Sequence, residues 1–275
     1  FEDKYSVSLL AGYTQQNAFY SNLNGSRRDA PSNDLQVFDA MTGTFTLGGN
    51  EAEWALRSFL GRANITFFDK YLLTATIRRD GSSRFGKDNR YGNFPSFALG
   101  WNIDREAFMQ KIPAINGFKL RASWGRLGNQ EIGNYSNITT VITSPRYFFG
   151  ADQIAPAAAV VELGNPALKW ESTEQTNIGI DLAFLDNTIT FTTDYWIKNT
   201  DGILLRTPVS VVSGVYRNNG AYENAAGLRN SGFEFLAGYN KRFGDFNLNV
   251  SANLSTVHNE VTSLGKGSEI LNLVE

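Results

Sequence analysis

The stretch FLGRANITFFDKYLLTATI, residues 59–77, decides the fold. Apolar or small side chains alternate with polar ones in residues 59–67 and again in residues 71–77, and the dipeptide Asp69-Lys70 stands between the two runs. Successive side chains of a β-strand point to opposite faces, so each run predicts a strand and the polar break predicts a tight turn. We therefore expect a β-hairpin with one apolar face and one polar face.

The same alternation recurs along the whole chain. Nine segments show it, and no charged residue stands on any of their apolar faces. Each segment runs for about 10 to 16 residues, which exceeds the usual length of soluble strands and is enough to cross a bilayer when tilted. The protein is therefore expected to be all-β. The nine apolar faces run from Tyr5 to Tyr13, Phe59 to Phe67, Tyr71 to Ile77, Pro95 to Ile103, Phe118 to Trp124, Ile178 to Phe184, Ile189 to Ile197, Phe233 to Tyr239 and Phe246 to Leu254.

The links between these segments alternate in length. Tight turns are expected at Asp69-Lys70 and Asp186-Asn187, and long links at residues 17–55, 129–168 and 200–228. Outer-membrane barrels alternate short periplasmic turns with longer extracellular loops, whereas a soluble sandwich has no reason to do so. The sequence thus predicts an antiparallel transmembrane β-barrel, integral to a bacterial outer membrane. Shorter links are expected at residues 79–93, 104–117 and 240–245.

Nine strands make an incomplete barrel. Single-chain bacterial outer-membrane barrels have an even number of strands, and an open edge in lipid leaves backbone groups without hydrogen-bond partners. The sequence starts at Phe1, without the charged start and apolar stretch of a signal peptide. We therefore expect residues 1–275 to be one part of a larger barrel domain, with the remaining strands outside this sequence.

Composition excludes several classes of function. The chain has no cysteine and a single histidine, His258, so disulfides, thiolate sites and sites with two imidazoles are excluded. A formal net charge of -2 argues against a nucleic-acid partner. The basic string RRDGSSRFG, Arg78–Gly86, is expected to be a solvated loop and not an anion site. We expect no catalytic residue, no metal site, no cofactor and hence no enzyme.

Charged residues on the polar faces of the predicted strands form a first set of candidate site residues. In a barrel these faces line the lumen, where their side chains would contact a plug domain, water or a passing substrate. We expect pairs among them to hold the plug. The set comprises Arg62, Arg78, Arg121, Asp181, Asp194 and Glu234.

Aromatic residues in the long links form a second set. Exposed rings with a few polar neighbours grip sugars and peptides, but they also pack loops against one another or against a partner protein. The sequence leaves both roles open. The set comprises Tyr20, Trp54, Tyr147, Phe148, Phe149, Tyr216 and Tyr222.

Five strings are more specific than the alternation. They are RRDGSSRFG at Arg78–Gly86, GNFPSFALGW at Gly92–Trp101, LRASWGRLGNQ at Leu120–Gln130, GNPALKWESTEQTNIGID at Gly164–Asp181 and LRNSGFE at Leu228–Glu234. In this order they resemble the barrel of the SusC/RagA family, the TonB-dependent outer-membrane transporters of Bacteroidetes.

The resemblance implies a plugged barrel of about 22 strands. It also implies active import of bulky nutrients, either oligosaccharides or peptides, together with a SusD-like surface lipoprotein. A plug domain, a TonB box and closing strands are not recognised in this sequence, so contact with the TonB complex is expected through regions outside it. The other expected partners are outer-membrane lipid, lipopolysaccharide and the glycan or peptide substrate.

Two further functions stay open at this point. A SusC-like barrel could serve as a structural scaffold in a larger outer-membrane complex, with its long loops docking partners. A soluble β-rich adhesin or glycan-binding protein would have to bury the uncharged faces in a core, and it would fold without detergent.

Overall fold

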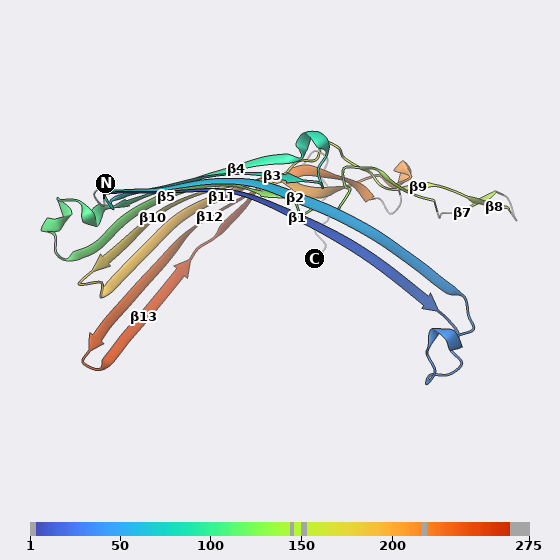
Figure 1. Cartoon of the computed structure of the whole chain (residues 1–275), viewed down its shortest axis with the longest axis horizontal. Helices are drawn as coiled ribbons and strands as arrows, with labels where there is room; N and C mark the ends of the chain where they lie inside the picture. Colours follow the sequence, from blue (N-terminus) through green and yellow to red (C-terminus); the bar gives the residue numbers. More distant parts are fainter. Residues whose placement is uncertain (1–3, 144–145, 150–152, 216–218, 265–275) are drawn as a thin grey trace.

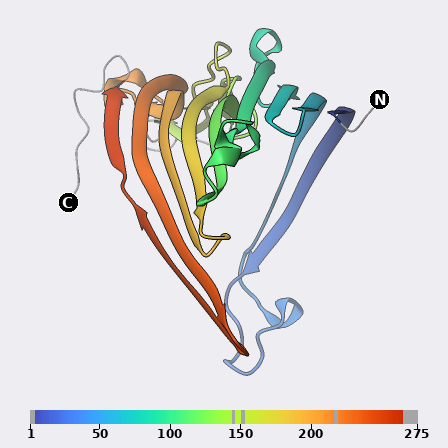
Figure 2. The ribbon, with the colours of Figure 1, turned by 90° about the vertical axis from the view of Figure 1, so that its left-hand side faces the viewer.

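One curved antiparallel sheet dominates the structure, a computed structural model that describes residues 4–143, 146–149, 153–215 and 219–264 (Figure 1). Its strand order is β1-β2-β3-β4-β5-β10-β11-β12-β13, and β14 pairs with β12. β1 and β13 end this order, and Figure 2 shows them on opposite sides of the sheet. The prediction of an all-β antiparallel architecture is confirmed.

The nine predicted segments correspond to the long strands of the sheet. β13 and β14 act as one strand, because both pair with β12 and the break between them is bridged by Thr256, whose backbone N–H donates to the Phe233 carbonyl at 2.8 Å. The strands are β1 (Tyr5–Arg27), β2 (Phe45–Phe67), β3 (Tyr71–Ser82), β4 (Tyr91–Asn102), β5 (Ile115–Asn129), β10 (Glu171–Phe184), β11 (Ile189–Pro208), β12 (Asn219–Phe243), β13 (Phe246–Ser255) and β14 (His258–Ser263).

Smaller elements lie in the links. Two short hairpins occupy the β5–β10 link, where β6 (Thr140–Ile142) pairs with β9 (Ala159–Glu162) and β7 (Arg146–Phe149) pairs with β8 (Gln153–Pro156). No helix among the described residues is long and apolar enough to cross a membrane. The 3₁₀ turns are η1 (Phe38–Ala40), η2 (Lys87–Asn89), η3 (Ile103–Arg105), η4 (Met109–Lys111) and η5 (Val211–Ser213).

A single row of side chains shows that the apolar positions share one face. Each residue of the row lies directly opposite the next one in the ladder, and directly opposite residues project from the same face of a sheet. All nine segments contribute one residue, and only the threonine is polar. The predicted apolar face is therefore confirmed. The row is Tyr5, Phe67, Tyr71, Trp101, Leu120, Ile180, Thr193, Phe235 and Leu254.

No second layer covers the apolar face within the described part of the chain. Leu9 is 76% exposed, Leu99 58% and Leu254 62%. Soluble proteins rarely leave so wide an apolar surface uncovered, whereas the outer band of a membrane barrel is covered by lipid. These exposures disagree with the soluble adhesin or glycan-binding protein, which needs these side chains in a core.

Short turns gather at one end of the sheet. The turns at Asp69-Lys70 and Asp186-Asn187 lie where the sequence predicts them. Phe68 and Asp69 have positive φ angles of 51° and 55°, and Leu185, Asp186 and Asn187 are also left-handed. Two successive positive φ angles match the twist of the flanking strands in tight hairpins. By the rule for outer-membrane barrels this is the periplasmic end.

The strands run further than predicted at the opposite, extracellular end. β1 continues to Arg27 and β2 starts at Phe45, so the predicted link 17–55 is wrong, and the β11–β12 link likewise spans only residues 209–218 instead of 200–228. Outside the bilayer both faces of a strand meet water, so apolar alternation stops while backbone pairing continues. The β1–β2 hairpin consequently projects beyond the neighbouring strands (Figure 1).

Candidate functional site on the polar face and the loop end

An ion network around Arg121 lies on the polar face of the sheet. Arg121 of β5 donates from Nε and Nη2 to the two carboxylate oxygens of Asp181 on β10, at 2.7 and 2.9 Å. It also donates from Nη1 and Nη2 to the two oxygens of Asp194 on β11, at 2.9 and 3.0 Å. One guanidinium therefore binds two carboxylates, each through two hydrogen bonds, which is the strong planar geometry of arginine.

Gly179 gives this network its space. It lies directly opposite Arg121 on one side and Asp194 on the other. A Cβ atom at this position would overlap Asp194 Oδ1 and stand 2.7 Å from Arg121 Nη2. Because only glycine lacks that atom, the guanidinium can pass over the backbone of β10 and reach β11.

The network has more acidic than basic groups. Glu234 of β12 lies directly opposite Asp194 and is exposed, whereas Lys119 lies directly opposite Asp181. Arg121 and Lys119 thus face three carboxylates. The surplus negative charge leaves this part of the polar face suited to a further cation.

The neighbouring part of the polar face is basic. Arg78 donates from Nε to both oxygens of Asp80, at 2.7 and 2.9 Å, and from Nη2 to Ser58 Oγ at 3.1 Å. Arg62 donates to Thr76 Oγ1 at 3.2 Å. All six charged residues of the first predicted set thus stand on the polar face, and their contact with a plug stays a prediction.

The loop end of the sheet has a small hydrophobic core. Phe85 of the β3–β4 link and Leu168 of the β5–β10 link are fully buried, and they pack with Ile132, which is 6% exposed. Burial of these side chains fixes the two links against each other. We call the core and the partly buried residues packed on it the loop cluster: Phe85, Ile132, Leu168, Trp170, Leu204 and Tyr222.

Four of the five family strings meet beside the loop cluster. The ring centroid of Trp170 lies 5.2 Å from that of Phe85 and 5.3 Å from that of Phe94. Phe94 lies over Gly128, where a Cβ would overlap its ring, and a Cβ on Gly86 would stand 2.8 Å from the Pro166 carbonyl oxygen. These strings therefore specify packing at the loop end.

The expectation that Arg78–Gly86 is a solvated loop is wrong. Ser82 and Phe85 have no exposed surface, and the Arg84 side chain is only 11% exposed. The segment Arg78–Gly86 is mostly polar in sequence, but Phe85 packs in the loop cluster and buries this part of the segment. Arg84 donates from Nε to Asn134 Oδ1 at 3.1 Å and from Nη1 to the Gln130 carbonyl at 3.2 Å, so these two nitrogens have partners inside the protein.

Side-chain hydrogen bonds from asparagine and tryptophan connect the loop cluster to the strands. Asn165 Nδ2 donates to the Tyr222 carbonyl at 2.8 Å, and Trp170 Nε1 donates to the Arg90 carbonyl at 3.1 Å. Asn224 Oδ1 accepts from the Lys169 N–H at 3.1 Å, while its Nδ2 donates to the Lys169 carbonyl at 2.8 Å. Irregular backbone thus finds the partners that a ladder would otherwise provide.

The predicted loop aromatics whose side chains the structure describes lie on different elements. Tyr222 packs in the loop cluster and lies 4.7 Å from the Arg206 guanidinium, whereas Tyr20 is 53% exposed on β1. Trp54 lies on β2, with the Arg84 guanidinium 4.9 Å from its ring centroid. Tyr147, Phe148 and Phe149 belong to β7, and Tyr216 lies outside the described residues.

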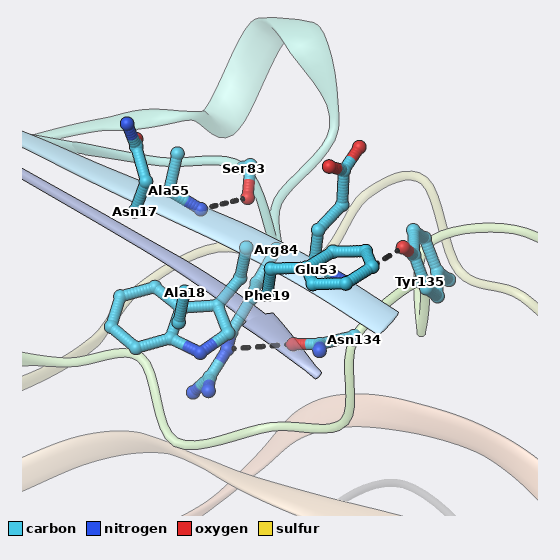
Figure 3. A pocket seen from close by; sticks show the side chains of 10 residues that line it. Asn17, Ala18, Phe19, Glu53, Ala55, Ser83, Arg84, Asn134 and Tyr135 are labelled. Atoms are coloured by element: carbon cyan, nitrogen blue, oxygen red, sulfur yellow. Dashed lines mark hydrogen bonds between the residues drawn. The ribbon is translucent and has the colours of Figure 1, made fainter. Parts of the chain in front are cut away.

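A cavity of about 340 Å³ lies where β2 extends past the end of β3, and we call it the fork cavity (Figure 3). Its floor is a last pair of hydrogen bonds, Ser83 N–H to the Ala55 carbonyl at 2.9 Å and Ala55 N–H to Ser83 Oγ at 2.8 Å. Further out, Tyr135 Oη accepts from the Glu53 N–H at 3.1 Å. The alternating pattern of the strands gives no signal for this cavity, because links supply the residues that close it against β1 and β2: Ser83, Arg84, Asn134 and Tyr135.

Glu106 organises the aromatic residues at the periplasmic end. Its carboxylate accepts from Lys70 Nζ at 2.8 Å, Tyr71 Oη at 2.8 Å and Trp101 Nε1 at 3.1 Å. These three donors hold the pKa of the Glu106 carboxyl below its ordinary value, with Lys70 the largest cause. The Tyr71 and Trp101 rings stack with centroids 6.3 Å apart, as in the aromatic girdle of a membrane barrel.

The strand register, the uncovered apolar face and the polar inner face together define a segment of an outer-membrane barrel wall. Comparison with known proteins agrees: residues 1–271 match the family described as TonB dependent receptor-like, beta-barrel. The chain therefore belongs to this family, whose members are integral outer-membrane transporters and not enzymes.

Curated relatives and solved structures place the chain within the SusC/RagA branch. It is 36% identical over 267 residues to TonB-dependent receptor P39 of Formosa agariphila, covering 96% of this chain and 25% of the relative. It is 36% identical over 219 residues to TonB-dependent receptor SusC of Bacteroides thetaiotaomicron, covering 78% of this chain and 21% of the relative. The chain thus spans about a quarter of the length of the relatives it matches.

Among solved structures, the RagAB peptide transporter superposes with a TM-score of 0.83 at 26% identity, covering 96% of this chain and 29% of that chain. The resemblance to the SusC/RagA barrel that the five strings indicate is therefore confirmed.

Proposed function

We propose that the complete protein imports a bulky nutrient, either an oligosaccharide or a peptide, across the outer membrane with energy from the TonB complex. The observation that supports this most is the similarity to the RagAB peptide transporter, which extends over 96% of the chain. A plug domain, a TonB box and the remaining barrel strands belong, in this proposal, to parts of the protein outside residues 1–275.

The polar face would hold the plug. Arg121, Asp181, Asp194 and Glu234 form a surplus of acidic groups in the middle of the wall, and Arg62 and Arg78 form a basic area beside it. A plug with complementary charges would be oriented as well as retained, because charge complementarity selects one docking geometry over others.

A SusD-like surface lipoprotein is the proposed partner at the extracellular end. The loop cluster fixes the β3–β4 link, the β5–β10 link and the β11–β12 hairpin against one another. Such a rigid surface suits a partner that has to close over the barrel mouth, because less conformational freedom is lost on binding.

Gene deletion in the native bacterium tests the transport proposal. The deletion strain should fail to grow on one class of oligosaccharide or peptide as sole carbon source, and depletion of TonB should reproduce the defect. Purification of the tagged complete protein in detergent, followed by mass spectrometry of the intact complex, should show a lipoprotein bound to it. Normal growth on every nutrient, together with a defect in assembly of another outer-membrane complex, would support the scaffold function instead.

A further inference from the structure

We propose that the fork cavity is a binding site for a neutral saccharide unit, carried by the barrel chain itself and separate from the lumen. This proposal rests on the proposed import function for its biological sense, but its evidence is the cavity. The cavity lies between the projecting β1–β2 hairpin and two links, beyond the last rung between β2 and β3 (Figure 3). Its volume of about 340 Å³ falls in the range of small-ligand sites.

Trp54 supplies a preorganised aromatic platform. Its ring is half-buried and packs on the Arg84 guanidinium, 4.9 Å from the ring centroid. Arg84 is in turn held by Asn134 Oδ1 and by the Gln130 carbonyl, at 3.1 and 3.2 Å. Ala18 lies directly opposite Trp54 on β1, and its small side chain leaves the ring accessible from that strand. A fixed ring binds the C–H face of a sugar without losing rotamer entropy.

Hydrogen-bond donors lie beside this platform. Tyr135 Oη already accepts the Glu53 N–H, so its own proton is left to donate to a ligand. Asn134 uses its Oδ1 to accept from Arg84, which leaves its Nδ2 as a donor. The Glu53 side chain points away from this platform, because Glu53 precedes Trp54 on β2 and successive side chains of a strand project from opposite faces. Sugar hydroxyl oxygens accept hydrogen bonds, so they match the donors of Tyr135 and Asn134.

Charge argues for a neutral ligand. Arg84 Nη1 lies 3.2 Å from Glu131 Oε2, so the guanidinium that lines the cavity is already paired with a carboxylate and offers little attraction to an acidic sugar. An apolar peptide side chain would use the ring of Trp54 but would leave the donors of Tyr135 and Asn134 unsatisfied, which costs affinity. A neutral saccharide satisfies both parts of the site.

Array binding of the complete protein, purified in detergent, tests the site. The probes are immobilised neutral oligosaccharides, acidic oligosaccharides and a peptide library. We expect binding to neutral oligosaccharides, weakened at least about tenfold by Trp54→Ala, as is usual when an aromatic anchor is removed. Tyr135→Phe, which keeps the ring and removes the hydroxyl, should weaken binding several-fold, and Trp54→Phe should retain part of it.

Phe45→Ala is the matched control, because Phe45 is an aromatic residue on the same strand, is 73% exposed and does not line the cavity. It should bind like the wild type. Absence of neutral oligosaccharide binding, preference for peptides, equal loss in the control, or unchanged affinity in folded Trp54→Ala would each overturn the proposal. Slower migration of boiled than unheated protein on gels verifies that a variant is folded.

The two proposals can fail separately. Normal nutrient uptake by the wild type combined with absence of array binding would overturn the fork site and leave import standing. Array binding that depends on Trp54, combined with unimpaired growth of the deletion strain, would overturn import and leave the site standing.

Discussion

Arg121 and Asp194 are hydrogen-bonded to each other across the full width of β10, the strand that separates them, through two N–H···O contacts of 2.9 and 3.0 Å. The bridge connects β5 to β11 without a ladder bond between them. It also concentrates charge, since Asp181 shares the same guanidinium. Arg121, Asp181 and Asp194 concentrate charge at one point of the polar face, so we expect a plug to contact the barrel wall there.

Charge reversal of Arg121 should therefore release the plug in the complete protein. Arg121→Glu adds a further carboxylate to Asp181, Asp194 and Glu234, and their repulsion would remove the charge pattern that the plug recognises. We expect cells with this variant to become sensitive to large antibiotics such as vancomycin, and Asp181→Lys should act in the same direction. The measurement is the minimal inhibitory concentration.

Arg126→Glu is the control for this experiment. Arg126 is on the same strand and pairs with Glu174, but it projects from the opposite face. Its reversal should leave antibiotic sensitivity unchanged. Equal sensitivity of both variants would indicate general damage to the barrel, and unchanged permeability of Arg121→Glu would count against contact with a plug.

Gly179→Ala should break the bridge while keeping every charge. The new Cβ would overlap Asp194 Oδ1, so the carboxylate has to move away from Arg121. Loss of charged hydrogen bonds costs about 1 to 3 kcal/mol, and we expect the free energy of unfolding in detergent to fall by this amount. Gly12→Ala is the matched control on the polar face of β1, because its Cβ would meet only Leu60 Cβ, at 3.9 Å. Equal stability of the two variants would show that Gly179 is not required for the network.

Alternation predicts the faces of the strands well, because lipid selects apolar side chains at every second position of a membrane strand. The row from Tyr5 to Leu254 contains one residue from each predicted segment. The same signal fails where β1 and β2 leave the bilayer, as at Gln15-Gln16-Asn17, although these residues remain paired with Ala55–Arg57. Strand ends in water are fixed by backbone hydrogen bonds, which leave little trace in side-chain hydropathy.

Burial in irregular links is not visible in any period. Phe85 and Leu168 lie in polar surroundings in the sequence and are fully buried in the structure. The strings that contain them indicated the family but not their mutual contact. The fork cavity was missed for the same reason: only Trp54 of its aromatic residues was a candidate, while Tyr135 and Arg84 come from links whose paths the sequence does not determine.

Leu168→Ala should loosen the loop end and spare the barrel wall. Removal of a fully buried leucine side chain costs about 2 to 5 kcal/mol, and here that loss falls on the contact between the β3–β4 and β5–β10 links. We expect rapid cleavage of the β5–β10 link by protease added to intact cells, with unchanged heat-modifiable migration of the barrel. Val212→Ala, at a position 93% exposed in the β11–β12 link, should be as resistant as the wild type. Equal resistance of Leu168→Ala would mean that the loop cluster does not hold the links.

Glu106→Gln should remove an acid-sensitive part of the stability at the periplasmic end. Hydrogen bonds from Lys70, Tyr71 and Trp101 lower the pKa of the folded Glu106 carboxyl below its ordinary value of 4.5, so the ionised form is favoured by folding. This contribution is present above the ordinary value and is lost as the pH falls through the lower pKa of the folded state. The wild type should therefore be more stable than Glu106→Gln at neutral pH, and the difference should shrink in acid below pH 4.5. Thermal unfolding in detergent between neutral pH and strong acid measures it. Asp245→Asn, which neutralises an exposed carboxylate in the β12–β13 turn, is the control and should follow the wild type. A difference between Glu106→Gln and the wild type that stays constant with pH would show that the glutamate acts through its shape and not through its charge.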